Sequence, residues 1–236
     1  MKKILVALLF APLLAFASGA ALHLDKWPGS VADKPALQNG AKLFVNYCLN
    51  CHGASYMRYN KLMELGLTEQ QVKDNLMFTA DKIGEPMRIA ARTEEQKQWF
   101  GAAPPDLTII ARARGSADGS GADWLYTYLR QFYRDDKRPT GWNNVVFENV
   151  GMPHILWELQ GEQVLNKDHK LELVVPGKMS PKEYDQAVSD LVGFLVWMGE
   201  PVQEFRKQLG WIVLAFLAVL FVFAYKLKKE YWKDVH

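Results

Sequence analysis

The sequence predicts a mainly α-helical domain with long loops, followed by one transmembrane helix near the C-terminus. Apolar residues recur at helical spacing along residues 36–47. An uncharged apolar stretch covers residues 209–225, which at ~1.5 Å rise per residue crosses most of a bilayer core. Apolar residues make up 49% of the 236-residue chain. That fraction is typical of a folded protein, and the length suits one main core.

The N-terminus has the pattern of an export signal. A basic MKK start precedes an apolar run over residues 4–16, and small residues suitable for cleavage follow. The run is too short for a membrane span and no stop-transfer pattern follows it. We therefore expect residues 1–20 to be a cleaved signal peptide, with a retained N-terminal anchor as the alternative.

Residues 36–47 form the first expected helix of the exported domain. Leu37, Ala41, Phe44 and Val45 share one apolar stripe. Gly40 fits a helix that another helix approaches closely, although it also fits an ordinary core helix with a tolerated glycine.

Cys48, Cys51 and His52 follow this helix and form a C-x-x-C-H motif, the attachment signature of a c-type haem. Residues three apart lie on one face of a helical turn, so both thiols can reach one porphyrin and the histidine can bind its iron. The chain has no other cysteine. A zinc site would need further ligands, and a thioredoxin-like motif would normally follow a strand.

Three further segments look helical. Residues 62–77 and, more weakly, residues 87–100 carry charges that suggest solvated faces without chemistry. A later helix begins with Ser180 as the cap, Pro181 at the first position and Glu183 completing a capping box.

A rigid Pro-Pro pair places Pro105 before Asp106, which is expected to cap a short helix beside something that needs fixed geometry. Pro105 is thus a candidate for contact with the cofactor. The short helix ends at Arg112 and Arg114. Either arginine could be only a partner of the helix dipole, or could pair with a haem propionate, because guanidinium matches carboxylate geometry.

A covalently held haem leaves one axial iron position open, and methionine often fills it in electron carriers. Met152 lies between Gly151 and Pro153 in an irregular segment, where a glycine allows close approach to a flat ring. The other methionines lie in helical or charged stretches, beside a helix cap, or in the signal. Met152 is therefore the candidate sixth ligand, with His154 as the alternative.

Residues 205–228 are expected to span the membrane, with aromatic residues near both ends as interfacial anchors. Lysines concentrate in and beside the tail, residues 229–236, which predicts a cytoplasmic tail and a periplasmic haem domain over residues 21–204. A buried core helix is the alternative for the apolar stretch.

The formal net charge of the whole chain is +2. Six basic residues but only two acidic ones lie in the predicted signal and the tail region, so the exported domain is slightly acidic. This balance disfavours nucleic acid as a partner and favours a basic soluble one.

These motifs together resemble the bacterial cytochrome c1 family, the haem c subunits of quinol:cytochrome c oxidoreductases (bc1 complexes). Every c-type cytochrome shares C-x-x-C-H, whereas the Pro-Pro-Asp-Leu block before Arg-x-Arg and the single C-terminal anchor are more particular. The matching stretches are residues 40–52, 101–114, 151–153 and 197–206.

The resemblance implies a class I cytochrome c-like domain around one covalently bound haem c. His52 and Met152 would be the iron ligands, and Arg114 the arginine near a propionate. The chain would make no bonds itself. It would take electrons from the Rieske iron–sulfur protein and pass them to soluble cytochrome c, in a dimeric complex with cytochrome b. That complex would lie in the lipid bilayer of the bacterial inner membrane.

Two other readings stay open. In the first, the chain also binds haem c, but it is a free-standing membrane-anchored cytochrome or the haem c subunit of a terminal oxidase. A dithiol–disulfide oxidoreductase or a metal-binding module on a stalk would use the thiols without haem.

Overall fold

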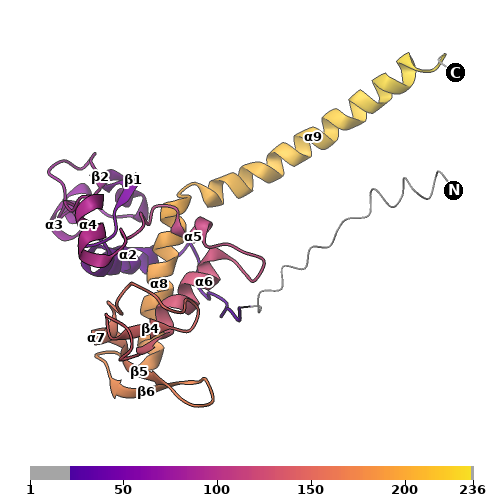
Figure 1. The fold of residues 1–236 in the computed structure, drawn as a ribbon. Helices are drawn as coiled ribbons and strands as arrows, with labels where there is room; N and C mark the ends of the chain where they lie inside the picture. Colours follow the sequence, from indigo (N-terminus) through magenta and orange to yellow (C-terminus); the bar gives the residue numbers. More distant parts are fainter. Residues whose placement is uncertain (1–21, 235–236) are drawn as a thin grey trace, which may run out of the picture.

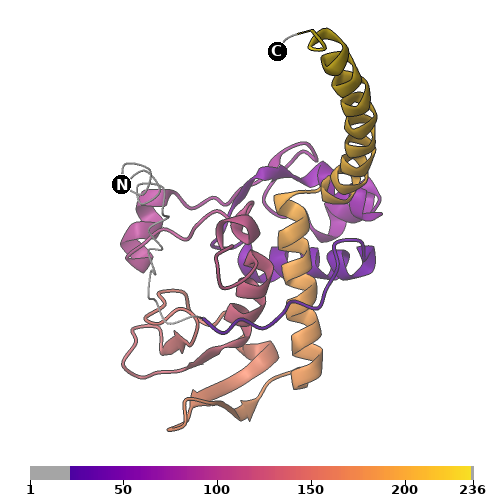
Figure 2. The same cartoon turned by 90° about the vertical axis from the view of Figure 1, so that its right-hand side faces the viewer.

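Helices α2 (Lys34–Leu43) and α8 (Pro181–Gly199) pack against each other at the centre of the fold. The structure is a computed structural model that describes residues 22–234, so the predicted signal peptide, residues 1–20, lies outside the described residues. Figures 1 and 2 show α8 running along the length of the domain. Helix α6 (Gly121–Arg130) also packs on α8. The prediction of a mainly helical fold is confirmed.

Gly40 lies where α2 meets α8. A methyl group at this position would lie 2.1 Å from the backbone oxygen of Asp190, so only glycine lets the two backbones come this close. One turn further on, the rings of Phe44 and Phe194 pack with centroids 5.5 Å apart, and both side chains are fully buried. The predicted close helix contact at Gly40 is confirmed.

Helix α8 begins as the sequence predicts. The Ser180 side chain accepts a hydrogen bond from the Glu183 backbone, while the Glu183 carboxylate accepts one from the Ser180 backbone at 2.8 Å. Pro181 occupies the first helical position. This cap satisfies N–H groups that the first turn of a helix would otherwise leave without partners.

The helix predicted over residues 62–77 is two shorter helices, η2 (Tyr59–Leu65) and α3 (Glu69–Asn75). Gly66 has a φ of +91°, which ends η2, and the Thr68 side chain caps α3. The weaker prediction over residues 87–100 is also too long, because α4 (Thr93–Phe100) covers only its second half.

Across residues 22–234, the long loops contain three antiparallel strand pairs. The pairs are β1 (Ala54–Arg58) with β2 (Pro86–Met87), β3 (Phe132–Arg134) with β4 (Trp142–Asn144), and β5 (Gly161–Leu165) with β6 (Leu171–Pro176). Helix α7 (Trp157–Gln160) precedes β5. The sequence analysis did not predict these strands, because each is only two to six residues long and gives too short a pattern.

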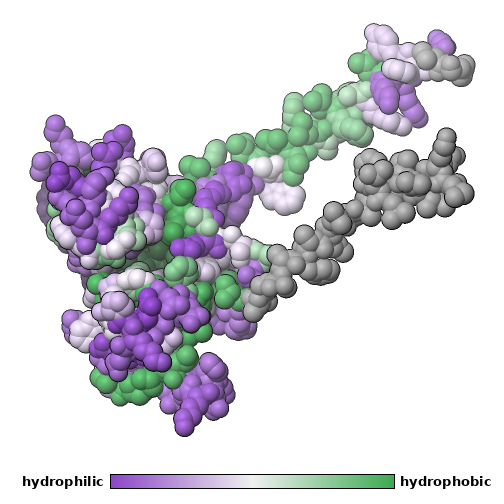
Figure 3. All heavy atoms as spheres, viewed as in Figure 1, coloured by the Kyte–Doolittle hydropathy of each residue, from purple (hydrophilic) through white to green (hydrophobic). Residues whose placement is uncertain are grey.

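Helix α9 (Gln203–Tyr231) leaves the domain and projects away from it (Figure 1). Its 29 residues correspond to about 44 Å, and its most apolar window has a mean hydropathy of 2.2 with none of it buried. Figure 3 shows the apolar surface along α9, with hydrophilic residues at its far end. Among the described residues it is the one helix long and apolar enough to cross a membrane, and it contains the predicted span, residues 205–228.

Candidate functional site

The C-x-x-C-H motif lies at the end of a π-helical turn, η1 (Phe44–Cys48), which continues α2. The His52 backbone N–H donates to the Cys48 carbonyl at 2.9 Å, so the motif itself closes into one more helical turn. Cys48 is buried and Cys51 is half-buried, and both thiols are free. The sequence predicts the helix but not its widening into a π turn, a feature that often marks functional sites.

The electrostatics of Cys48 bear on the alternatives to haem. Burial, with a smaller contribution from Cys51, raises the pKa of the Cys48 thiol to about 12. A thiol that keeps its proton is a poor nucleophile for disulfide exchange. Within residues 22–234, no group of three or more His, Cys, Asp or Glu side chains gathers in a way that could hold a metal ion. The high pKa of the Cys48 thiol therefore disfavours the dithiol–disulfide alternative.

His52 has a defined orientation. Its Nδ1 atom lies 2.7 Å from the carbonyl oxygen of Pro105, and because a carbonyl only accepts, Nδ1 carries the hydrogen. Burial lowers the pKa of His52, although Pro105 and Asp106 oppose this effect. The neutral ring therefore leaves the lone pair of Nε2 for a metal, which is the usual arrangement of a ligating histidine.

The segment that carries Pro105 is tied to the residues that follow His52. The Asp106 carboxylate accepts hydrogen bonds from the Ser55 backbone at 2.8 Å and from the Thr108 backbone at 2.9 Å. The Leu107 backbone donates to the Gly53 carbonyl at 2.8 Å. The expectation that Asp106 caps a helix is wrong, since α5 (Ile110–Ala113) begins four residues later. Asp106 instead closes a local turn and clamps it to β1.

Gln96 is a site residue that the sequence analysis missed. It is buried on α4 and its side-chain amide donates to the Cys51 carbonyl at 2.9 Å. The neighbours of Gln96 on α4 are mostly exposed, and they include charged, polar and aromatic residues, so the local pattern gives no signal for a buried glutamine. Only the long-range contact reveals it.

The structure separates the two arginines. Arg112 forms an ion pair with Glu200 at 3.0 Å, whereas Arg114 lies over the ring of Trp124 at 4.4 Å and that of Phe147 at 5.6 Å. No ion pair to Arg114 is formed by the residues that the structure describes. Its guanidinium is therefore held in place by aromatic faces while its charge is left for another carboxylate.

Met152 is half-buried against the core, and its sulfur accepts a hydrogen bond from the Tyr128 hydroxyl at 3.4 Å. A Cβ at the neighbouring Gly151 would meet only open space. The alternative ligand, His154, is buried with its ring stacked on Phe132 at 4.9 Å, and burial lowers its pKa to about 4. Tyr128, like Gln96, was not anticipated from the sequence.

The predicted site residues thus fall into two groups. Cys48, Cys51, His52 and Pro105 lie together, while Arg114 and Met152 lie beside α6, on which Trp124 and Tyr128 stack. Residues 105–114 run from the first group to the second. Large apolar side chains remain exposed near these residues. Ile109 lies within residues 105–114, Phe147 lies under the Arg114 guanidinium, and Ile155 follows Met152 by three positions. A flat apolar group lying between the two groups would cover such side chains, so the residues fit a haem.

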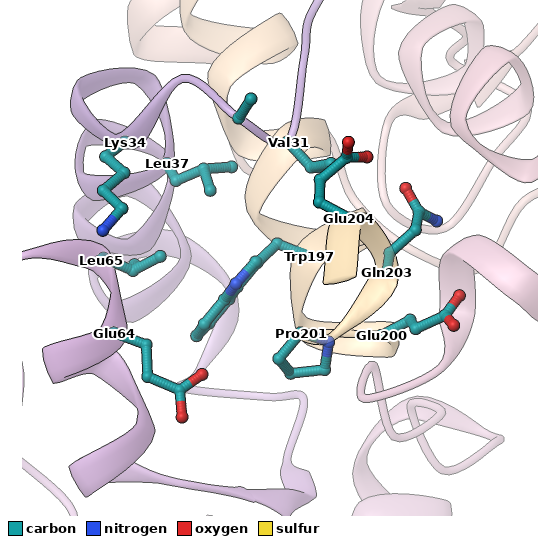
Figure 4. A pocket seen from close by; sticks show the side chains of 11 residues that line it. Val31, Lys34, Leu37, Glu64, Leu65, Trp197, Glu200, Pro201, Gln203 and Glu204 are labelled. Atoms are coloured by element: carbon teal, nitrogen blue, oxygen red, sulfur yellow. The ribbon is translucent and has the colours of Figure 1, made fainter. Parts of the chain in front are cut away.

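A hollow at the foot of α9 is separate from these groups (Figure 4). Leu37, Leu65, Trp197 and Pro201 form its apolar lining, and its volume is about 290 Å³. Its acidic lining residues are engaged elsewhere, as Glu200 is with Arg112. None of the predicted site residues lines it.

A mainly helical fold with a C-x-x-C-H turn and one long apolar C-terminal helix fits the class of membrane-anchored c-type cytochromes. Comparison with known proteins narrows it. Residues 25–235 match the sequence pattern described as the Cytochrome C1 family. The chain belongs to the cytochrome c1 family.

Three relatives illustrate the family's range. A protein of Allochromatium vinosum named cytochrome c1 is 46% identical over 100% of both chains. A protein of Nitrosomonas europaea named ammonia monooxygenase gamma subunit is 49% identical over 100% of this chain and 98% of its own. A Bradyrhizobium diazoefficiens protein named cytochrome b/c1 is 29% identical over 90% of this chain, which covers 36% of that longer protein.

Family membership implies a haem c cofactor and the setting of a bc1 complex. With helix α9, it also fits a single-pass membrane protein.

Proposed function

We propose that this chain carries electrons from the Rieske iron–sulfur protein to soluble cytochrome c, as the haem c subunit of a respiratory bc1 complex. The observation that carries the proposal is the hydrogen bond from His52 to Pro105, because it leaves Nε2 free beside the two thiols. The haem iron, when bound, supplies reversible one-electron chemistry. The protein supplies ligands, charge and burial.

Each site residue has a role in this proposal. Cys48 and Cys51 would hold the porphyrin through thioether bonds, and His52 and Met152 would bind its iron. The Pro105 carbonyl orients the His52 ring. Arg114, held over Trp124, pairs with a propionate.

The proposed topology follows from the charges at the two ends of α9. Residues 1–20 are the signal peptide, residues 21–204 form the periplasmic domain, residues 205–228 cross the inner membrane, and residues 229–236 form the cytoplasmic tail. Arg206 and Lys207 at the domain end pair with Glu200 and Glu204, while the far end has a surplus of lysines. Positive loops remain on the cytoplasmic side.

The proposed partners are cytochrome b, the Rieske protein and soluble cytochrome c, in a dimeric complex. The Bradyrhizobium diazoefficiens relative supports the first of these, since its printed name joins b and c1. A second candidate is a haem c subunit that stands alone or serves another complex. The Nitrosomonas europaea relative supports this second candidate, because the printed name of that relative assigns it to an ammonia monooxygenase.

Purification of this chain from its native membranes in mild detergent tests the proposal. We expect b-type haem to co-purify, together with quinol-dependent reduction of cytochrome c. An intact preparation with c haem alone, or with an unrelated oxidase, would support the second candidate. A haem stain on a denaturing gel separates both from a dithiol protein, because only thioether-bound haem survives denaturation.

A further inference from the structure

The hydroxyl of Tyr128 donates a hydrogen bond to the sulfur of Met152 at 3.4 Å. The direction is unambiguous, since a thioether sulfur has no hydrogen to give and the phenol has one. The contact joins residues 24 positions apart, from α6 to the irregular segment around Gly151. Sulfur is a weak acceptor, so a buried hydroxyl aimed at it needs a reason.

The ring of Tyr128 is held firmly in this orientation. It is buried, stacks on Trp124 at 4.7 Å with planes 14° apart, and meets Phe132 edge-on at 5.1 Å. The Asn144 side chain donates to the Tyr128 carbonyl at 2.8 Å. The phenol oxygen therefore cannot move away from the Met152 sulfur without disturbing the aromatic packing.

We propose that Tyr128 is a positioning residue that orients the Met152 thioether toward the iron and raises the reduction potential of the haem. The inference rests on the proposed ligation of iron by Met152. A thioether sulfur has two lone pairs. With one lone pair bound to the iron, the other would accept the Tyr128 hydrogen. The thioether would then be held in one orientation.

The same hydrogen bond withdraws electron density from the sulfur. Ferric iron needs more donation from its ligands than ferrous iron, so weaker donation favours the reduced form. Hydrogen bonds to ligands are one of the means by which proteins tune haem potentials. Tyr128 thus acts through Met152, and does not need to touch the cofactor.

Replacement of Tyr128 by phenylalanine removes the hydroxyl and keeps the ring. We expect Tyr128→Phe to shift the equilibrium between reduced and oxidised haem about threefold toward the oxidised form. At about 59 mV per tenfold, this lowers the reduction potential by about 28 mV. The far-red charge-transfer band of methionine-bound ferric haem should shift or weaken. The measurements are a redox titration and a ferric spectrum of the full chain in detergent.

Tyr126→Phe and Tyr184→Phe are matched controls. Tyr126 lies on the same helix under Arg130, and the Tyr184 hydroxyl donates to the Leu129 carbonyl at 2.8 Å. The hydrogen bond to the Met152 sulfur comes from Tyr128. Both controls should leave the potential and the band unchanged. Equal shifts in the controls and in Tyr128→Phe would overturn the inference, because they would reflect general loosening.

The wild-type spectrum separates failure of the inference from failure of the proposed ligand set. A wild-type protein without the methionine band contradicts ligation by Met152. A wild-type protein with the band, and a Tyr128→Phe variant with unchanged band and potential, contradicts only the role of Tyr128. If the variant does not accumulate, the test is the stretching vibration between the haem iron and the Met152 sulfur, compared in H2O and D2O for the wild type. The absence of a shift on exchange would overturn the role of Tyr128.

Discussion

The Nδ1 atom of His52 lies 2.7 Å from the carbonyl oxygen of Pro105. This one contact connects two motifs that are 53 residues apart. It explains why a proline pair, which fixes the backbone direction, precedes Asp106. Pro105 thus supports the histidine through its backbone carbonyl. Another residue at this position could do the same only if the backbone kept the same turn.

Met152→Leu tests the proposed sixth ligand. Leucine keeps the apolar volume but cannot bind iron, so we expect a marked fall in the reduction potential and loss of the methionine band. Electron transfer from the iron–sulfur partner should stall. Met198→Leu, in the buried core, is the control and should leave the potential unchanged. An unaltered potential in Met152→Leu would contradict the assignment.

Arg114→Gln and Arg112→Gln form a matched pair. Loss of a cation near the haem disfavours the reduced state, so we expect Arg114→Gln to lower the potential by about 40 mV, or about 1 kcal/mol for one electron. Arg112 is engaged by Glu200, and its replacement should leave the potential within error. Redox titration of both variants checks this, and a larger effect at Arg112 would reverse the assignment of the arginines.

The parts of the fold that the sequence predicts correctly are those specified locally. The helical stripe through Leu37, the cap at Ser180 and the apolar run of α9 each repeat or terminate within a few residues. The spacing of C-x-x-C-H is equally local. The position of Met152 beside Gly151 already made it a candidate ligand, with His154 as the alternative. The resemblance to cytochrome c1 favoured Met152, and it favoured Arg114 over Arg112.

The parts that were missed depend on contacts between distant segments. Gln96 reaches Cys51 across 45 positions, and Tyr128 reaches Met152 across 24. Neither side chain differs from its neighbours in any periodic pattern. The prediction that Asp106 caps a helix failed for a related reason. An aspartate after prolines suits a helix cap and a clamped turn equally well.

Gly40→Ala should destabilise the domain strongly. The added methyl group would lie 2.1 Å from the Asp190 backbone oxygen, and a backbone atom cannot move aside as a flexible side chain can. We expect the free energy of unfolding to fall by about 1–3 kcal/mol. Gly84→Ala is the control, since nothing lies within 4 Å of its added carbon. Urea unfolding in detergent measures both, and equal losses would contradict the close contact.

Asp123 predicts an acid dependence of stability. Burial opposes its ionisation, but hydrogen bonds from Lys26, the Trp27 backbone and Ser120 outweigh burial and lower the pKa to about 2. An unfolded aspartate titrates near 3.9. Ionised Asp123 therefore stabilises the fold above about pH 4, and this contribution is lost as the pH falls through about 2.

The variant Asp123→Asn should lower the free energy of unfolding by about 1–2 kcal/mol at neutral pH. The difference from wild type should shrink between about pH 4 and pH 2. Asp136→Asn, at an exposed position, should have no effect at either pH. A difference that stays constant down to pH 2 would rule out the ionised carboxylate as its source.

Gln96→Ala tests whether a buried amide on α4 shapes the haem attachment turn. The Gln96 amide holds the Cys51 carbonyl at 2.9 Å, and without it that carbonyl loses its buried partner. We expect less haem bound per chain, because Cys51 and His52 are then less well placed while the haem is being attached. The ratio of haem stain to antibody signal on a denaturing gel measures this directly. Gln98→Ala, on the exposed face of the same helix, should keep the wild-type ratio. Equal ratios in all three proteins would mean that the turn is held by the His52 to Pro105 contact and its own backbone alone.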